Sequence, residues 1–133
     1  WIEINGKKVS LIDDAYNANP ASMAAGLKML ALCEGRKIAV LGDMLELGDS
    51  GLQKHLDLCP ILEQTKVDQV YAVGPMMHEM FQHLSPTQQG AWRETPDQLW
   101  PILESSLQSG DIVFIKSSHG TGLYKLVDKV KGK

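Results

Sequence analysis

The chain has 133 residues, of which 44% are hydrophobic and 22% charged, a balance that is ordinary for one globular domain with its own core. The 13 basic and 16 acidic residues leave a net charge of -3, which gives no electrostatic support to a nucleic-acid or membrane-surface partner. No apolar run approaches the roughly 18 residues that a bilayer-spanning helix needs.

The chain opens with a predicted antiparallel hairpin. Strand-like residues 1–4 and 8–12 flank Asn5-Gly6, a dipeptide that strongly favours a two-residue hairpin turn. Later strands are predicted from short, nearly unbroken apolar runs, which are typical of strands buried on both faces of a parallel sheet. These runs span 38–41, 70–73 and 112–115, and residues 91–93 form a weaker, edge-like candidate.

Amphipathic helices are predicted between the strands, because apolar residues recur there at helical spacing. The stripes span 23–31, 77–84, 99–107 and 123–130. The segment Thr95-Pro96-Asp97-Gln98 has the N-cap, first-turn proline and capping-box glutamine that start the third of these helices.

A further helix, over 50–64, is predicted to be irregular. Its apolar register consists of Leu52, Leu56, Cys59 and Leu62. Pro60 lies inside it, and a mid-helix proline removes a hydrogen bond and clashes with the preceding turn. We therefore expect a kink or a restart near Leu58.

This alternation of strands and helices predicts an α/β fold. We expect a Rossmann-like three-layer sandwich of about six strands, five parallel and one antiparallel from the hairpin, with helices on both faces. No repeat, low-complexity tract or internal linker interrupts residues 1–133, which indicates one domain. The chain starts at Trp1 inside a strand-like pattern, so we expect it to be a piece of a longer protein.

Polar residues collect where predicted strands give way to helices. Three such junctions are the bends 13–20, 42–48 and 116–119. Ligands of open α/β sheets bind at the carboxyl edge of the strands, so polar junctions there predict a ligand site. We expect the three bends to share one rim of the folded domain.

The first bend has both a structural and a functional interpretation. Asp13 and Asp14 are adjacent in a strand and point to opposite faces, so they are not expected to act as a paired acid and base. Turn formation accounts for Asn19 as a helix cap and partly for Asn17. It leaves Asp14 and Tyr16 unexplained, and a carboxylate beside an aromatic face suits a ribose diol and a base.

The last bend, Lys116-Ser117-Ser118-His119, precedes the final helix. A lysine, hydroxyls and free helix N–H groups together favour an anion such as a carboxylate or phosphate. The alternative is a serine N-cap beside a solvated lysine.

Standard catalytic and metal motifs are missing from the sequence. No phosphate-cradling loop, dinucleotide fingerprint, nucleophile elbow or HExxH pair occurs. His55 and Cys59 are spaced i, i+4, but two ligands do not make a metal site, and we interpret the histidines as surface residues. Cys33 and Cys59 lack CxxC spacing, which predicts reduced thiols in a cytosolic protein.

Taken together, these motifs resemble the C-terminal domain of the Mur ligase family. The resemblance covers essentially the whole chain and is carried by Asp13-Asp14-Ala15-Tyr16-Asn17-Ala18-Asn19-Pro20 with Ser22-Met23, Gly42-Asp43-Met44-Leu45-Glu46-Leu47-Gly48 with His55, Val73-Gly74, and Lys116-Ser117-Ser118. It is strongest to the members that add D-Ala-D-Ala to UDP-MurNAc-tripeptide.

The resemblance implies a cytoplasmic, ATP-dependent enzyme of peptidoglycan precursor synthesis. In the family the γ-phosphoryl group of ATP activates the tripeptide carboxylate as an acyl phosphate, which the dipeptide amine then attacks. The phosphate loop and magnesium ligands belong to a central domain, and a separate N-terminal domain holds the UDP end. The resemblance thus implies that this chain alone is catalytically inert and that Mg²⁺ is bound mainly outside it.

The resemblance also implies roles for particular residues. Asp14 would hold the ATP ribose, with Tyr16, Asn17 and Asn19 beside the base. Lys116, Ser117 and Ser118 would lie near the carboxylate of the incoming dipeptide. Asp43, Glu46 and His55 match motif positions without an assigned role. The chain departs from the family's usual Lys-Gly-Ser pattern at Ser117, and from the Arg or Asn that follows it at His119.

The sequence also allows two other functions. A receiver-like phosphoacceptor signalling domain also places paired acids after its first strand, an aspartate after a later strand and a lysine after the last. Here, however, Asp43 follows the second parallel strand rather than the third, Gly74-Pro75 stands where a hydroxyl is expected, and no proline follows Lys116. The other alternative is a non-catalytic nucleotide-binding module.

Overall fold

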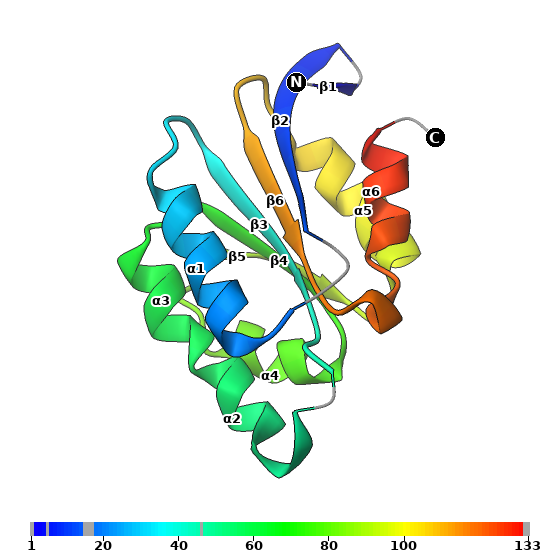
Figure 1. Ribbon diagram of the computed structural model, residues 1–133. Helices are drawn as coiled ribbons and strands as arrows, with labels where there is room; N and C mark the ends of the chain where they lie inside the picture. The colour runs from blue at the N-terminus through cyan, green and yellow to red at the C-terminus, as the bar shows by residue number, and fades with distance from the viewer. Residues whose placement is uncertain (1, 5, 15–17, 46, 132–133) are drawn as a thin grey trace.

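The computed structural model describes residues 2–4, 6–14, 18–45 and 47–131. In these residues six strands form one sheet in the order β1-β2-β6-β3-β4-β5, in which only β1 and β2 pair antiparallel (Figure 1). The strands are β1 (Ile2–Ile4), β2 (Lys7–Asp14), β3 (Lys37–Gly42), β4 (Gln69–Val73), β5 (Gln89–Arg93) and β6 (Ile112–Lys116). The predicted mixed sheet is confirmed.

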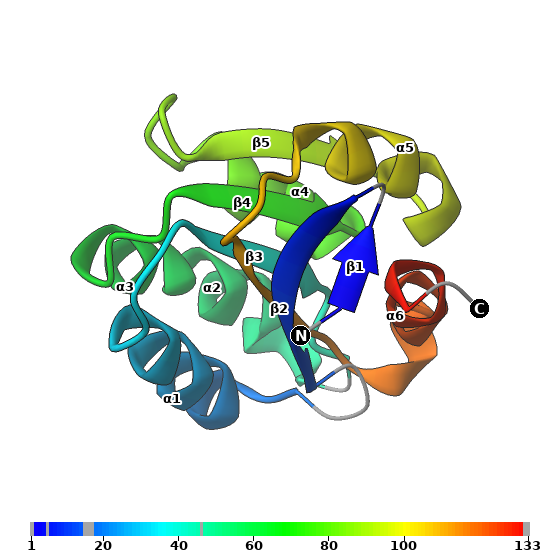
Figure 2. The same ribbon diagram turned by 90° about the horizontal axis from the view of Figure 1, so that it is seen from above.

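Helices cover both faces of this sheet. They are α1 (Pro20–Ala31), α2 (Gly51–Leu56), α3 (Leu58–Gln64), α4 (Pro75–Gln82), α5 (Pro96–Ser106) and α6 (Tyr124–Val130), with short 3₁₀ turns η1 (Gly48–Ser50) and η2 (His119–Thr121). Helices α1, α3 and α4 pack on one face, and α5 and α6 on the other (Figure 2). The three-layer α/β sandwich is therefore confirmed. No helix in the described part of the chain is long and apolar enough to cross a membrane.

The direction of chain travel explains this division of helices. From β2 through β3 and β4 to β5 the chain moves one way across the sheet, whereas β6 returns to lie between β2 and β3. Because crossovers between parallel strands are right-handed, the reversal places α5 on the opposite face. The insertion of β6 also puts its carboxyl end between those of two other strands.

The apolar runs are buried on both faces, as predicted. In β3, Ala39 and Leu41 belong to the core under α1, α3 and α4, whereas Ile38 and Val40 belong to the core under α5 and α6. Successive side chains of a strand alternate between faces, so an unbroken apolar run serves two cores at once.

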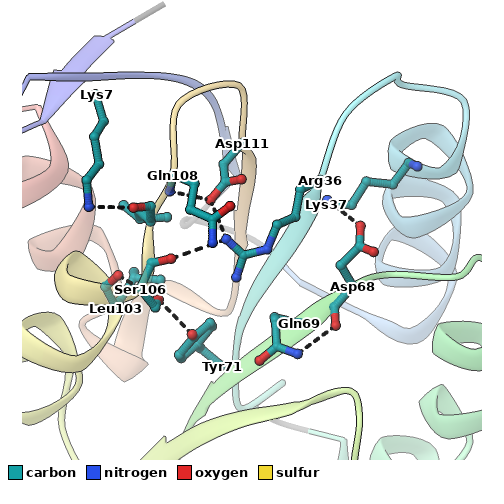
Figure 3. Close-up of polar contacts among 11 residues, drawn as sticks. Lys7, Arg36, Lys37, Asp68, Gln69, Tyr71, Leu103, Ser106, Gln108 and Asp111 are labelled. Atoms are coloured by element: carbon teal, nitrogen blue, oxygen red, sulfur yellow. Dashed lines mark hydrogen bonds and ion pairs between the residues drawn. The ribbon is translucent and has the colours of Figure 1, made fainter.

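The amino edge of the sheet is closed by a polar network (Figure 3). Buried Asp111 accepts hydrogen bonds from Arg36 Nη1 (3.1 Å) and from the Gln108 amide (2.8 Å). Arg36 also donates to the Ser106 carbonyl, and the Ser106 hydroxyl accepts from Tyr71 (2.7 Å). This network joins α5 to the starts of β3 and β6, and its partners are all supplied within the fold.

The predicted helix starts are confirmed. The Ser22 amide donates to Asn19 Oδ1 (2.9 Å), and the Asn19 amide donates to Ser22 Oγ (3.1 Å), which is a complete capping box. Thr95 and Gln98 make the same reciprocal pair at the start of α5. These bonds satisfy helix N–H groups that would otherwise lack partners.

The helix containing Pro60 restarts at Leu58, as predicted, but its predicted buried face is only partly right: Leu62 is buried and Cys59 packs partly buried against the core. Leu52 is 44% exposed, and the buried residues are Gly51, His55, Leu58 and Leu62. A search for apolar residues at helical spacing missed the first half of this face, because that half consists of a glycine and a histidine.

Gly26 allows α1 to approach the sheet closely. A Cβ atom at this position would lie 2.5 Å from Cζ of Phe114, a buried side chain of β6. The glycine therefore compensates for its poor helix propensity by permitting this contact.

We expect Gly26→Ala to lower the free energy of unfolding by about 1–3 kcal/mol, because the added methyl overpacks against Phe114. Helix propensity alone would instead raise it by about 1 kcal/mol. Urea unfolding measures the sign. The control, Ala25→Gly at the exposed neighbouring position, tests propensity alone, with an expected loss of about 1 kcal/mol. Stabilisation by Gly26→Ala would contradict the close approach.

Candidate functional site at the carboxyl rim

Parallel register brings the predicted polar bends to one edge of the sheet. Asp14 at the end of β2 and Leu41 near the end of β3 both lie opposite Lys116 of β6. Gly42 lies opposite Val73 of β4, so the chain that follows β4 reaches the same edge. We call this edge the rim and define it as Asp14, 42–45, Gly74 and 116–118. The expectation that the described parts of the three bends share a rim is confirmed.

An ion pair joins two of the predicted site residues. The Lys116 ammonium donates to Asp14 Oδ2 across the β2–β6 pair. Lys116 is only 2% exposed, whereas the Asp14 side chain is 49% exposed. The Asp14 carboxylate therefore lies at the surface of the rim, and the buried Lys116 ammonium holds it in place.

The other residues of the first bend that the structure describes make different contacts. Asp13 points away from Asp14, as predicted from strand alternation, and lies 3.8 Å from Lys131 Nζ. The side chain of Asn19 caps α1. Three further predicted positions lie outside the described residues, namely Tyr16, Asn17 and Glu46.

Asp43 caps a helix from the neighbouring crossover. It is 3% exposed, and its two carboxylate oxygens accept from the amides of Met76 (3.2 Å) and Met77 (2.8 Å) in the first turn of α4. A carboxylate at this position also complements the positive end of the helix dipole. Sequence reasoning missed this role because the capped helix begins more than thirty residues later.

Gly74 makes this contact possible. It precedes α4 with a positive φ of 108°, and a Cβ atom there would lie 2.5 Å from Asp43 Cγ. Helix α4 has no side-chain cap of its own at Gly74. A Gly-Pro helix start without a capping side chain was the sequence signal that a distant residue supplies the cap.

His55 is a buried residue, so the interpretation of the histidines as surface residues is wrong for it. Its Nε2 lies 2.9 Å from the Met44 amide and its Nδ1 lies 2.6 Å from the Gly51 carbonyl. Cys59 instead donates to the Met80 carbonyl (3.3 Å), and burial raises the pKa of its thiol. The described residues contain no group of three or more His, Cys, Asp or Glu side chains that could hold a metal ion.

The segment after β6 is tied to the bend after β3. Ser118 Oγ accepts from the Leu45 amide (2.9 Å), and the Ser118 amide donates to the Asp43 carbonyl (3.3 Å). Buried Ser117 donates through its hydroxyl to the Ser118 carbonyl. Helix α6 begins only at Tyr124, so the 3₁₀ turn η2 separates these serines from its N-terminus.

Two hollows of the surface lie away from the described rim residues. Two neighbouring cavities of about 620 and 490 Å³ flank the stacked rings of His78 and Trp92, whose centroids are 4.1 Å apart. Both lie beside β5, the edge strand farthest from Asp14 along the sheet. None of the predicted site residues lines them.

A Rossmann-like sheet with a polar carboxyl rim is typical of α/β domains that bind ligands. The family model described as Mur ligase, glutamate ligase domain, matches residues 1–119. The chain therefore belongs to the Mur ligase family, and it resembles the C-terminal part of its MurF members.

Curated relatives and solved structures agree with this assignment. UDP-N-acetylmuramoyl-tripeptide--D-alanyl-D-alanine ligase of Mycobacterium leprae is 34% identical over 144 residues, covering 93% of this chain and 28% of the relative. The chain thus spans little more than a quarter of that relative. The structure of MurF from Acinetobacter baumannii matches with a TM-score of 0.82 and 33% identity, over 98% of this chain and 30% of the other.

Two further structures bear on nucleotide binding and on the extent of the domain. MurF ligase from Thermotoga maritima, solved in complex with ADP, matches with a TM-score of 0.81 and 26% identity, over 95% of this chain and 29% of the other. A crystallised domain of a Haemophilus ducreyi protein matches with a TM-score of 0.65 and 20% identity, over 98% of this chain and 99% of that one. The last match shows a shared fold.

We expect Asp43→Ala to lower the free energy of unfolding by about 2–3 kcal/mol, because the two amides at the start of α4 lose a charged acceptor. Asp43→Asn keeps one acceptor oxygen and should lose about half as much. The control is Asp49→Ala in an exposed turn, for which we expect a change within about 0.5 kcal/mol. Equal urea midpoints for Asp43→Ala and Asp49→Ala would show that the cap does not stabilise α4.

Proposed function

We propose that this chain is the C-terminal domain of a cytoplasmic, ATP-dependent ligase that joins D-Ala-D-Ala to UDP-MurNAc-tripeptide in peptidoglycan precursor synthesis. Family membership and the names of the similar proteins support this proposal. The observation that carries it for this chain is the ion-paired, half-exposed Asp14 at the rim, in a domain whose fold is that of an ADP-bound ligase.

The reaction has two chemical steps. A carboxylate oxygen of the tripeptide takes the γ-phosphoryl group, so that a new P–O bond forms as the β,γ-anhydride bond of ATP breaks and ADP leaves. The dipeptide amine then attacks the acyl carbon, loses a proton and expels phosphate. Activation is needed because a carboxylate oxygen is a poor leaving group until it is phosphorylated.

The residues of this chain bind and orient rather than perform these steps. Asp14 suits a ribose, because its outward carboxylate can accept hydrogen bonds from both hydroxyls of the diol while Lys116 keeps it in place. Tyr16, Asn17 and Asn19 belong beside the base in this proposal. We place Lys116, Ser117 and Ser118 near the dipeptide carboxylate, where Lys116 would act while paired with Asp14.

In this proposal, segments outside these 133 residues bind the magnesium ion and the ATP phosphates. The described rim offers one half-exposed carboxylate, Asp14, because both oxygens of Asp43 are engaged by α4. A magnesium ion bound to ATP normally takes carboxylates together with phosphate oxygens. This chain would instead close over the ligands held by the central and N-terminal domains and exclude water, which would hydrolyse the acyl phosphate.

Nothing in the described residues supports the signalling alternative. A phosphoacceptor aspartate must expose a carboxylate oxygen, whereas Asp43 is buried and caps α4. Incubation with acetyl phosphate tests this alternative directly, since it requires a stable phospho-aspartate at Asp43. The other alternative, a non-catalytic nucleotide-binding module, would require that the full gene encode no phosphate-loop domain.

The full-length gene product should release phosphate from ATP only when both UDP-MurNAc-tripeptide and D-Ala-D-Ala are present. We expect Asp14→Asn to raise the KM for ATP about tenfold, equivalent to about 1.4 kcal/mol, with a smaller effect on kcat. Asparagine is chosen because its oxygen still accepts from buried Lys116. The control is Asp13→Asn, on the opposite face of β2, which should stay within about twofold.

These measurements separate two kinds of failure. If the wild-type enzyme does not couple phosphate release to the dipeptide, the proposed function is wrong. If it does so but Asp14→Asn leaves the KM for ATP unchanged, only the ribose assignment is wrong.

The isolated chain should be folded and catalytically inert, and it should bind ATP no more tightly than about millimolar, or about 4 kcal/mol. The reason is that it would hold only the base and ribose end of the nucleotide. Calorimetric titration measures this affinity, with Asp14→Asn as the control for binding at the rim. Micromolar binding would contradict the proposed division of ATP between domains.

A further inference from the structure

The bend 42–48 matches the family motif but carries no assigned role, and the structure shows how its residues Met44 and Leu45 are held. Two of its amides donate to side chains from distant parts of the chain: Met44 to His55 of α2 and Leu45 to Ser118 after β6, both at 2.9 Å. The Met44 side chain is fully buried, as is His55. The main chain of this bend at Met44 and Leu45 is therefore held by side chains from α2 and from the segment after β6.

The contacts of His55 define its protonation state. A carbonyl oxygen only accepts, so the Nδ1 that meets the Gly51 carbonyl must carry a hydrogen. An amide N–H only donates, so the Nε2 that meets Met44 must be unprotonated. His55 is thus a neutral imidazole with its hydrogen on Nδ1, and an imidazolium could not accept the Met44 hydrogen bond.

We propose that His55 is a positioning residue of the rim, acting through the bend 42–48 on the Asp14–Lys116 pair. This inference rests on the proposed function for its effect on ATP. The connection is continuous: His55 holds Met44, the adjacent Leu45 amide binds Ser118, and Ser118 lies two residues beyond Lys116. The Asp43 carbonyl adds a second link, since it accepts from the Ser118 amide.

The bend also couples the rim to α4. The Asp43 side chain caps that helix while its carbonyl binds Ser118. A shift of the bend therefore disturbs the ends of β3 and β6 and the start of α4 together. An imidazole that joins a helix carbonyl to a bend amide opposes such a shift, because both of its nitrogen atoms are engaged in a buried site.

The first test measures the imidazole itself by ¹⁵N NMR on the isolated chain. We expect His55 Nδ1 to show the chemical shift of a protonated ring nitrogen and Nε2 that of an unprotonated one. His83 is the matched control, because its Nδ1 also lies near a carbonyl four residues earlier, that of Glu79 (2.8 Å), but its side chain is exposed. A His55 spectrum with the hydrogen on Nε2, or on both nitrogens at neutral pH, would overturn the proposal.

The second test uses His55→Leu and His55→Gln. Leucine removes the acceptor for the Met44 amide, so hydrogen exchange at Met44 should accelerate at least about tenfold. The glutamine oxygen can replace Nε2 and should restore most of the protection. In the full-length enzyme His55→Leu should raise the KM for ATP about fivefold, His55→Gln less, and the control His83→Leu not at all.

The outcomes separate this inference from the proposed function. Faster Met44 exchange with an unchanged KM for ATP in an active ligase would refute the positioning role while the function stands. An inactive wild-type enzyme would refute the function, whereas the NMR spectrum and the exchange data would still test the His55 clamp on the bend.

Discussion

A buried lysine at the end of a central strand is the constraint on which the rim depends. An ammonium group taken out of water must be paired, because an isolated buried charge is very costly. Lys116 ends β6, which lies between β2 and β3, and its partner is Asp14 at the end of β2. The pairing requires the parallel register of these strands, so the geometry of the candidate nucleotide contact depends on how the sheet is assembled.

The rim is a connected set of hydrogen bonds rather than three independent loops. The bend after β3 reaches α4 through Asp43, α2 through His55 and the segment after β6 through Ser118. Most of these partners are buried, where hydrogen bonds are stronger and unpaired groups are more costly. Such a rim is largely preformed, which reduces the ordering that a ligand must impose when it binds.

Local signals in the sequence predicted the elements of the fold well. Asn5-Gly6, the helix cap at Asn19, the capping box at Thr95, and Pro60 each act within a few residues, and the structure has a helix start or a restart at the last three. The unbroken apolar runs also placed the strands correctly, because burial on both faces leaves little choice of residue. The predicted face of the helix before Pro60 was wrong at Leu52, which is exposed, and it missed a buried polar residue, His55.

The sequence by itself determined the fold class, the positions of the strands and the three polar bends, because these follow from periodicity and turn chemistry. It also identified the family through several motifs, each of which consists of residues that are close in sequence. Only the tertiary structure decided what the polar residues contact: Asp43 caps α4, His55 binds the bend and Lys116 meets Asp14. The partner of each lies at least eleven positions away, so only the insertion of β6 and the packing of the helices bring them together.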